Sequence, residues 1–322
     1  MSEQAAARGN WVAVLVVGAG VATLLPVVPS AAALCAGILL AVTVGNPLAE
    51  RTRALSRKLL PAAVIGLGGA MDLPAVLRVG SRGIGYTVIS IAVTLTLGMV
   101  LTRFLSISRR TGLLIAAGTA ICGGSAIAAA APVLGAKDEE ISVALGTVFV
   151  LNSVALIVFP PVGHWLALGQ PAFGLWAALG IHDTSSVVGA SMQYGPTALQ
   201  IATTVKLARA LWIVPLTIYL AKAARTEDPG TPAAKAQRPW FILGFLAVAA
   251  LASFVPELRS SGLLLASGAR RLLVLTLFLI GLGLSRKTLK SVGVRPFVLG
   301  VVLWAALGLG TLAAIRAGLI SI

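Results

Sequence analysis

The sequence predicts an all-α polytopic membrane protein with about 10–11 transmembrane helices, two of them discontinuous. Of its 322 residues, 58% are hydrophobic and only 11% are charged, and the mean hydropathy is +0.98. A soluble domain carries roughly 25% charged residues. The apolar residues also fall into long runs separated by short polar breaks, and about 20 apolar residues are needed to cross a hydrocarbon core of about 30 Å.

Eleven apolar runs are candidates for helices, although several are short or interrupted by glycine. They comprise residues 11–28, 30–46, 59–73, 84–105, 111–136, 140–160, 171–194, 196–221, 239–255, 268–285 and 294–317. The run that begins at Trp11 is expected to be a retained helix and not a cleaved secretory signal. Residues 111–136 and 171–194 contain glycines and polar residues, and these two runs are the expected discontinuous helices. We therefore expect one integral membrane domain over residues 1–322.

The net charge of +15 comes from basic residues that gather in the polar breaks. Four clusters stand at residues 51–58, 109–110, 222–238 and 286–290, and cytoplasmic loops are the part of a membrane protein enriched in Lys and Arg. With eleven spans, all four lie on one side, which predicts a cytoplasmic N-terminus and an outside C-terminus. Residues 137–140 and the turn at Gly195 are then expected on the opposite side. No basic helix carries interleaved aromatic residues, so no nucleic-acid partner is expected.

One linker and two internal repeats organise the chain. Residues 221–239, AKAARTEDPGTPAAKAQRP, are rich in charge, alanine and proline, and form the expected cytoplasmic linker. The Gly-Leu-Gly segment at 66–68 repeats at 281–283, each after a basic pair. Residues 118–132 resemble residues 179–191. Duplicated helix bundles are common in transporters.

Residues 118–126, GTAICGGSA, place three glycines, a threonine and a serine inside an apolar run. Backbone at membrane depth can leave the helical form only where protein or a water-filled cavity surrounds it. A half-helix that begins there directs free N–H groups and the positive end of its dipole into the gap, which favours anions. We expect Gly123, Gly124 and Ser125 to bind substrate. The alternative is that the small residues only allow close helix packing.

Five consecutive polar residues, His182 to Ser186, interrupt another apolar run. An aspartate at membrane depth costs roughly 2.5–3.5 kcal/mol, which marks Asp183 as functional. It also fits a helix N-cap in mid-membrane. We expect Thr184, Ser185 and Ser186 to bind substrate. Asp183 and His182 are the candidates for carrying a coupling proton, because imidazole titrates near physiological pH. A lone histidine is otherwise a hydrogen-bonded structural residue.

The run at 196–221 carries two cations, Lys206 and Arg209, near its middle. This position is too deep for the side chains to reach the membrane surface easily. At 100° per residue, Thr203, Lys206 and Arg209 share one helix face, which must point into the protein. A structural ion pair with Asp183 is one interpretation. Two cations against one carboxylate leave a positive surplus, so an anionic substrate is the other, with Asn152 as a neutral hydrogen-bonding neighbour.

Motifs of soluble enzymes are lacking from the sequence. It holds no phosphate-binding loop, no nucleophile elbow and no cluster of metal ligands, and its two cysteines, Cys35 and Cys122, lie in separate apolar runs. We expect no catalytic residue, no cofactor and no metal.

Four motifs in order resemble the bacterial YeiH-like family of sulfate exporters. They are TAICGGSAIAAAAPV, VFVLNSVALIVFPPVGHWL, FGLWAALGIHDTSSVVGAS and ATTVKLARALWIVPL, and the resemblance extends from about Ala31 to Gly308. It also points to cation/proton antiporters and bile-acid/sodium symporters, which implies discontinuous helices and a homodimer. Related folds use inverted repeats, whereas with eleven spans the two broken segments run the same way. Either one of the two segments re-enters the membrane without crossing it, or the number of spans differs from eleven.

The leading hypothesis is a secondary transporter in the bacterial cytoplasmic membrane that moves a small anion by alternating access. The anion would be sulfate-like, a small organic acid or a sulfonate. The coupling ion would be a proton or sodium. One alternative is a monovalent cation/proton antiporter with Asp183 as ion ligand and Lys206 as its competitor. Another is a membrane subunit or channel without coupled transport.

Overall fold

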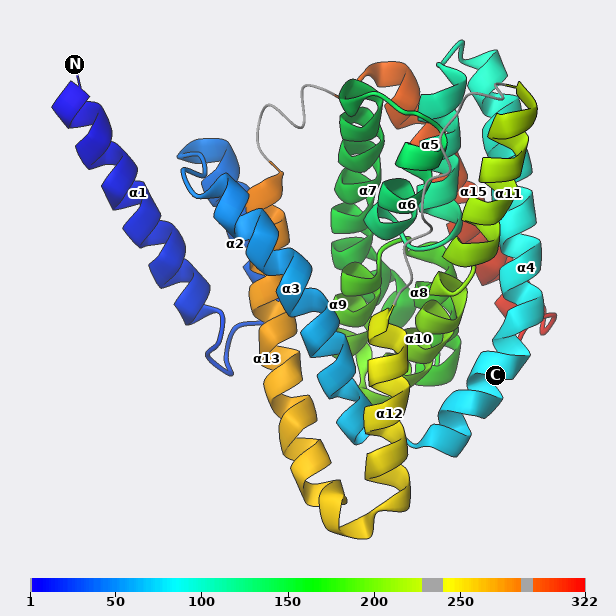
Figure 1. Ribbon diagram of the computed structural model, residues 1–322. Helices are drawn as coiled ribbons and strands as arrows, with labels where there is room; N and C mark the ends of the chain where they lie inside the picture. The colour runs from blue at the N-terminus through cyan, green and yellow to red at the C-terminus, as the bar shows by residue number, and fades with distance from the viewer. Residues whose placement is uncertain (1, 228–239, 285–291, 322) are drawn as a thin grey trace. The chain divides into compact units, whose positions relative to one another are not determined.

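The computed structural model describes residues 2–227, 240–284 and 292–321, and all regular structure in these ranges is helical (Figure 1). Each of the eleven predicted runs is helical over most of its described residues, which confirms the all-α polytopic class. Within these ranges, five helical stretches are long and apolar enough to cross a membrane. They are Gly85–Phe104, Asp138–Trp165, Pro196–Leu220, Pro256–Gly283 and Val294–Arg316.

The chain divides into two compact units. The first comprises Met1–Ala75 and Trp240–Leu289, and the second comprises Val76–Pro239 and Lys290–Ile322. In the first unit, helices α1 (Ser2–Ala22), α2 (Ser30–Thr43), α3 (Ala49–Leu67), α12 (Trp240–Phe254) and α13 (Arg259–Gly283) are joined by the short 3-10 helices η1 (Gly68–Ala70) and η2 (Pro256–Leu258). Helix α13 packs mainly on α2 and α3.

Glycines let the helices of the first unit approach backbone to backbone. A Cβ atom on Gly281 would lie 2.5 Å from the carbonyl oxygen of Leu34, and one on Gly37 would overlap the carbonyl oxygen of Phe278. A Cβ atom on Gly262 would likewise lie 2.6 Å from the carbonyl oxygen of Gly69. Small residues at helix contacts are the usual means of tight association in lipid, where no hydrophobic effect drives helices together. The repeated Gly-Leu-Gly segment at 281–283 therefore includes one of these contacts.

The second unit contains nine helices within the described ranges. They are α4 (Leu73–Phe104, which begins in the first unit), α5 (Arg109–Ala120), α6 (Gly124–Val133), α7 (Asp138–Trp165), α8 (Gln170–Gly180), α9 (Thr184–Tyr194), α10 (Pro196–Ala210), α11 (Ile213–Glu227) and α15 (Val294–Arg316). At about 1.5 Å per residue, the 28-residue α7 is about 42 Å long, enough to cross a bilayer. In Figure 1, α5 and α6 lie beside its upper part, and α8 beside its lower part.

The first discontinuous segment, α5 and α6, turns back on itself. The hydroxyl of Ser108, which caps α5, donates to Glu140 Oε1 at 2.7 Å, and Glu140 belongs to the first turn of α7. A Cβ atom on Gly135, just after α6, would lie 4.0 Å from the guanidinium of Arg110. The segment thus begins and ends at the N-terminal end of α7. We call it hairpin 1.

The second discontinuous segment, α8 and α9, also turns back. The hydroxyl of Tyr194, the last residue of α9, donates to the Leu168 carbonyl at 2.6 Å, just before α8. The Tyr194 ring stacks on His164 in the last turn of α7, with ring centroids 4.2 Å apart. The amide oxygen of Gln170 accepts from the Thr197 N–H at 2.9 Å. This hairpin 2 therefore begins and ends at the C-terminal end of α7.

The two hairpins correct the predicted placement of residues 137–140. These residues lie beside the start of α5 and so share an end of the unit with the basic cluster at 109–110, whereas eleven alternating spans require opposite sides. Because the hairpins have their bases at opposite ends of α7, the two broken segments are inverted relative to each other. The conflict with inverted repeats arose from counting each hairpin as a crossing.

Two further boundaries differ from the sequence prediction. The run predicted as one helix over 196–221 is two helices, α10 and α11, with a turn at Leu211 and Trp212. Pro215 explains the turn, because its ring removes an N–H and clashes with the carbonyl four residues earlier, that of Leu211. The predicted linker is helical from 221 to 227, and its remainder, 228–239, lies outside the described residues, as do Arg286, Lys287 and Lys290.

Candidate functional site

The tips of the two hairpins meet in the interior of the second unit. Gly123, in the break between α5 and α6, has a φ of +67°, a conformation that favours glycine. A Cβ atom on Gly123 would lie 3.2 Å from the His182 carbonyl oxygen and 3.4 Å from Asp183 Cβ, in the break between α8 and α9. Two helix C-termini, of α5 and α8, and two N-termini, of α6 and α9, therefore come together at one place.

Asp183 is the N-cap of α9, as its sequence context predicts. Its Oδ2 accepts from the Ser186 N–H at 3.0 Å and from the Ser186 hydroxyl at 3.1 Å, and also from the Ser185 hydroxyl. An N-cap carboxylate satisfies the free N–H groups of the first turn and complements the helix dipole. The side chain is 8% exposed. The carboxylate is thus bound by hydroxyl and backbone groups.

Lys206 caps the C-terminus of α8. Its Nζ donates to the carbonyl oxygen of Ile181 at 2.8 Å and to that of Ala178 at 3.4 Å. Ala178 lies in the last turn of α8 and Ile181 directly follows it, and a cation near the C-terminal carbonyls of a helix is stabilising. The side chain is completely buried. The ion pair with Asp183 that the sequence suggested is not formed between these described residues.

Arg209 reaches both hairpins. Its Nε donates to the carbonyl oxygen of Ala120 at 2.6 Å, and its Nη1 donates to that of Leu179 at 2.9 Å. Ala120 is the last residue of α5, and Leu179 lies in the last turn of α8. Arg209 is also completely buried. The cationic face of α10 thus points into the unit, as predicted.

Asn152, in the middle of α7, holds the tip of hairpin 2. Its Oδ1 accepts from the backbone N–H of His182 at 2.9 Å. Both residues are 1% exposed. The amide group therefore satisfies a backbone donor that the break between α8 and α9 leaves without a helical partner.

Several buried polar atoms at or near the tips have no hydrogen-bond partner within the described part of the chain. Three nitrogen atoms are among them, Asn152 Nδ2, His182 Nε2 and Arg209 Nη2, and so are the hydroxyl oxygens of Thr119 and Thr203. Leaving such a group unpaired costs about 1–3 kcal/mol, and more for a charged one. Buried groups of this kind call for a partner such as water or an ion.

The other predicted binding residues differ in their accessibility. Thr184 and Ser186 are 7% and 5% exposed, and Ser185 is completely buried. Gly124 begins α6 and is half-buried, while Ser125 is exposed. Among these polar residues only Ser125 is exposed; Asp183, Thr184 and Ser186 keep a small accessible fraction, and both cations are completely buried.

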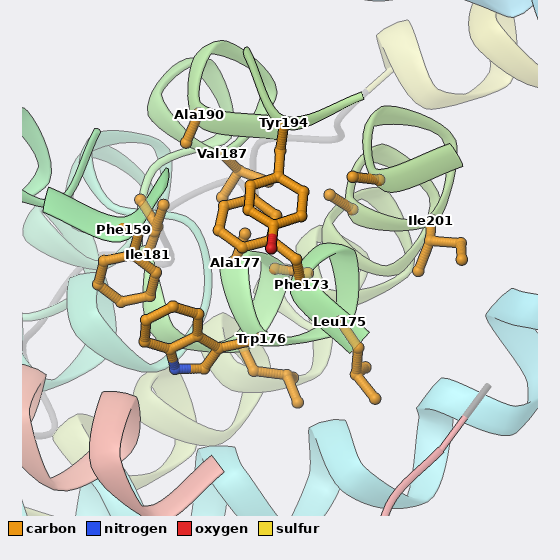
Figure 2. Close-up of a cluster of buried hydrophobic side chains, with 14 of the residues drawn as sticks. Phe159, Phe173, Leu175, Trp176, Ala177, Ile181, Val187, Ala190, Tyr194 and Ile201 are labelled. Atoms are coloured by element: carbon orange, nitrogen blue, oxygen red, sulfur yellow. The ribbon is translucent and has the colours of Figure 1, made fainter. Parts of the chain in front are cut away.

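Aromatic side chains hold hairpin 2 against its neighbours, a role that sequence reasoning missed (Figure 2). The rings of Phe173 and Tyr194 stack with centroids 3.6 Å apart, and those of Phe159 and Trp176 stack at 4.1 Å. The indole N–H of Trp176 donates to the Gly308 carbonyl at 2.8 Å. Their only signal in the sequence is apolar periodicity, which does not distinguish them from lipid-facing residues. They join α7, α8, α9 and α15.

The site offers no cluster suited to a metal. Within the described ranges, no three His, Cys, Asp or Glu side chains gather as a metal site would require. Cys122, between α5 and α6, is a buried free cysteine.

Comparisons with known proteins place the chain in a family. A family model described as "Conserved hypothetical protein 698" matches residues 11–300. A UPF0324 membrane protein of Bdellovibrio bacteriovorus is 56% identical over 294 residues, which are 91% of this chain and 90% of the relative. Another, of Geobacter sulfurreducens, is 47% identical and covers 90% and 92%. A third, of Photobacterium profundum, is 47% identical and covers 90% and 87%.

No solved structure matches the chain. The family match spans both discontinuous segments and the helix that carries the two buried cations, and each of the three relatives aligns over most of its length. This chain belongs to the UPF0324 membrane protein family.

Proposed function

We propose that this protein is a secondary transporter that moves a small anion across the cytoplasmic membrane of a bacterium by alternating access. The proposed substrate is sulfate-like, a small organic acid or a sulfonate, in line with the resemblance to the YeiH-like family. The proposed site is the meeting point of the hairpin tips, and the protein is proposed to transport its solute without transforming it.

The observation that carries this proposal is the set of buried donors without acceptors at the tips. Asn152 Nδ2 and Arg209 Nη2 are N–H donors, and His182 Nε2 becomes one when it carries a proton. An anion supplies the acceptors that such donors require. The α6 N-terminus adds backbone N–H groups, because Gly123 offers no side-chain cap.

The charge of the site also favours an anion. In their ionised forms, Lys206 and Arg209 bring two positive charges against the one negative charge of Asp183, within a low-dielectric interior where each charge is costly unless balanced. The partial negative charges of the two helix C-termini offset the partial positive charges of the two helix N-termini. A monovalent anion such as a sulfonate would make the site neutral, and a divalent anion such as sulfate would do so together with one coupling proton.

Asp183 and His182 are the proposed coupling groups, for a proton or for sodium. Asp183 is more accessible than either cation, at 8% against 0% exposure, so of these three side chains it is the one that an ion or proton can reach most directly. The same observation favours the second candidate, a monovalent cation/proton antiporter in which Asp183 is the ion ligand. A homodimer is proposed from the resemblance alone.

The hairpins leave the proposed orientation unchanged. If α5–α6 and α8–α9 re-enter, nine segments cross, and an odd number still places a cytoplasmic N-terminus opposite the C-terminus. The basic clusters at 51–58, 109–110, 222–238 and 286–290 again fall on the cytoplasmic side, as the positive-inside rule requires. The loop before Gln170 and the turn at Gly195 fall outside.

The experiment is flux into proteoliposomes with purified protein. Uptake of radiolabelled sulfate or a small sulfonate, lost in Lys206→Ala and reduced in Asn152→Leu, is the expected result. Proton flux that depends on sodium, is lost in Asp183→Asn and occurs without anion flux would overturn it in favour of the antiporter. Absence of both fluxes in a folded sample would favour a subunit or channel without coupled transport.

A further inference from the structure

We propose that Arg209 is a positioning residue that ties the two hairpin tips into one rigid element. The inference concerns the site of the proposed function and rests on that function only for its purpose, namely to keep the tips in register while the site changes access. The bonding that carries it is independent of what the site binds.

The two carbonyls that Arg209 contacts belong to different hairpins. The Nε–Ala120 bond is 2.6 Å and the Nη1–Leu179 bond is 2.9 Å. Hairpin 1 and hairpin 2 extend from opposite ends of α7, so these carbonyls come from elements that approach the centre from opposite directions. One guanidinium on α10 therefore joins them.

Helix ends explain why this contact is needed. The last four carbonyls of a helix have no intrahelical partner, and at membrane depth no bulk water is available to bind them. Both α5 and α8 end in the interior, so each leaves such carbonyls at the tips. Guanidinium suits two acceptors in different directions, because it holds five donors in a planar fork.

Lys206 provides an internal comparison one helical turn earlier on α10. Its ammonium also caps a helix end, but its acceptors, Ala178 and Ile181, both belong to hairpin 2. Lys206 and Arg209 are equally buried. They therefore differ in connectivity: Lys206 stabilises one tip, whereas Arg209 stabilises both and links them.

The test is amide hydrogen exchange measured by mass spectrometry on the purified full chain in detergent, comparing Arg209→Met with Lys206→Met. The readout is exchange in peptides that cover 117–124 in hairpin 1 and 177–183 in hairpin 2. Backbone donors in these turns include Ile121, bonded to Ala117, and Ile181, bonded to Ala177. When a cap is lost, the last helical turn opens more often, and its amides exchange faster.

We expect Arg209→Met to accelerate exchange in both peptides by about 10- to 150-fold, since one lost hydrogen bond to a charged group contributes about 1.5–3 kcal/mol. Lys206→Met is expected to accelerate exchange by a similar factor in 177–183 alone. Peptides from α4 and α15 in the second unit report whether that unit is folded in a variant, and their exchange is expected to stay within about twofold of the wild type.

Arg209→Lys keeps the charge and tests the link itself. The two carbonyls are bonded by two separate nitrogen atoms of Arg209, and the one nitrogen of lysine does not reproduce that spacing, so we expect the lysine to protect one tip better than the other. Acceleration confined to one peptide in Arg209→Met, or equal acceleration of both in Lys206→Met, would overturn the proposal. If Arg209→Met does not fold, Arg209→Lys decides in its place: faster exchange at one or both tips supports a link made by the guanidinium fork, and wild-type exchange at both tips would contradict it.

Failure of this inference differs from failure of the proposed function. The exchange pattern requires no substrate, so a protein without anion flux can still show linked tips. Conversely, anion flux with independently loosened tips would refute the role of Arg209 and leave the transporter proposal intact.

Discussion

The side-chain Oδ1 of Asn152 accepts a 2.9 Å hydrogen bond from the backbone N–H of His182. The contact joins the middle of α7 to the tip of hairpin 2. The amide oxygen of Asn152 accepts from a backbone N–H that has no helical partner at the break between α8 and α9. Both groups are uncharged, so the effect of this hydrogen bond on stability can be tested separately from charge.

Asn152→Leu is expected to destabilise the protein by about 1–3 kcal/mol, because the His182 N–H is left buried without an acceptor. Asn152→Asp keeps an acceptor for this N–H but adds a charge. The measurement is thermal unfolding in detergent. Ser153→Ala is the matched control: its hydroxyl donates to the Phe149 carbonyl of its own helix, so a small change is expected. A cost for Asn152→Leu no larger than for the control would contradict the prediction.

Asp183→Asn and Asp183→Ala separate the cap of α9 from its charge. Asparagine keeps an oxygen that can accept from the Ser186 N–H, whereas alanine removes the cap at a cost of about 0.5–2 kcal/mol. We expect Asp183→Ala to unfold at a lower temperature than Asp183→Asn. If Asp183 carries the coupling proton, both variants lose proton-coupled flux. Full coupling in a folded Asp183→Asn sample would exclude that role.

Gly123→Ala tests the close contact between the tips. The positive φ costs a non-glycine residue about 1–2 kcal/mol, and the new Cβ would lie 3.2 Å from the His182 carbonyl oxygen. We expect lower thermal stability and faster amide exchange in both tips. Gly310→Ala, in the same unit, is the control, because a Cβ atom there meets nothing within 4 Å. Equal stability of the two variants would show that Gly123 is not constrained as described.

Single cysteines test the hairpins directly. In a background with Cys35 and Cys122 replaced by serine, cysteines at Ser108 and Glu139 are expected to react with a membrane-impermeant maleimide from the same side. Cysteines at Gly169 and Gly195 are expected to react from the other side. Labelling of Ser108 and Glu139 positions from opposite sides would restore the eleven-span arrangement and refute hairpin 1.

The sequence predicts the helical segments and the buried polar residues well, because apolar runs and mid-membrane charges are local signals. Asp183 as an N-cap and the inward face carrying Lys206 and Arg209 both follow from helix periodicity and capping rules. The return of each hairpin does not follow from such local rules, because it depends on contacts between residues far apart in the sequence, such as Ser108 with Glu140 and Leu168 with Tyr194. A run of 26 apolar residues that crosses and one that turns back have the same hydropathy.

Partner choice is the other part that local rules do not reach. Opposite charges suggested a pair between Lys206 and Asp183, but helix ends compete for both groups: carbonyls of α8 take the ammonium, and N–H and hydroxyl groups at the start of α9 take the carboxylate. This competition depends on the fold that brings the ends of α5, α6, α8 and α9 together, and no local pattern in the sequence indicates that arrangement.

The unequal number of cations and carboxylates at the tips has an electrical consequence. Moving one elementary charge through a membrane potential of 100 mV changes the free energy by about 2.3 kcal/mol. With Lys206, Arg209 and Asp183 all ionised, voltage acts on the empty site as on a single positive charge, and on the site loaded with a monovalent anion hardly at all. Return of the empty carrier, and not the loaded step, would then set the voltage dependence. The measurement is flux at imposed membrane potentials. We expect exchange of anions by the loaded carrier to be insensitive to voltage, and net uptake, which requires return of the empty carrier, to depend on it.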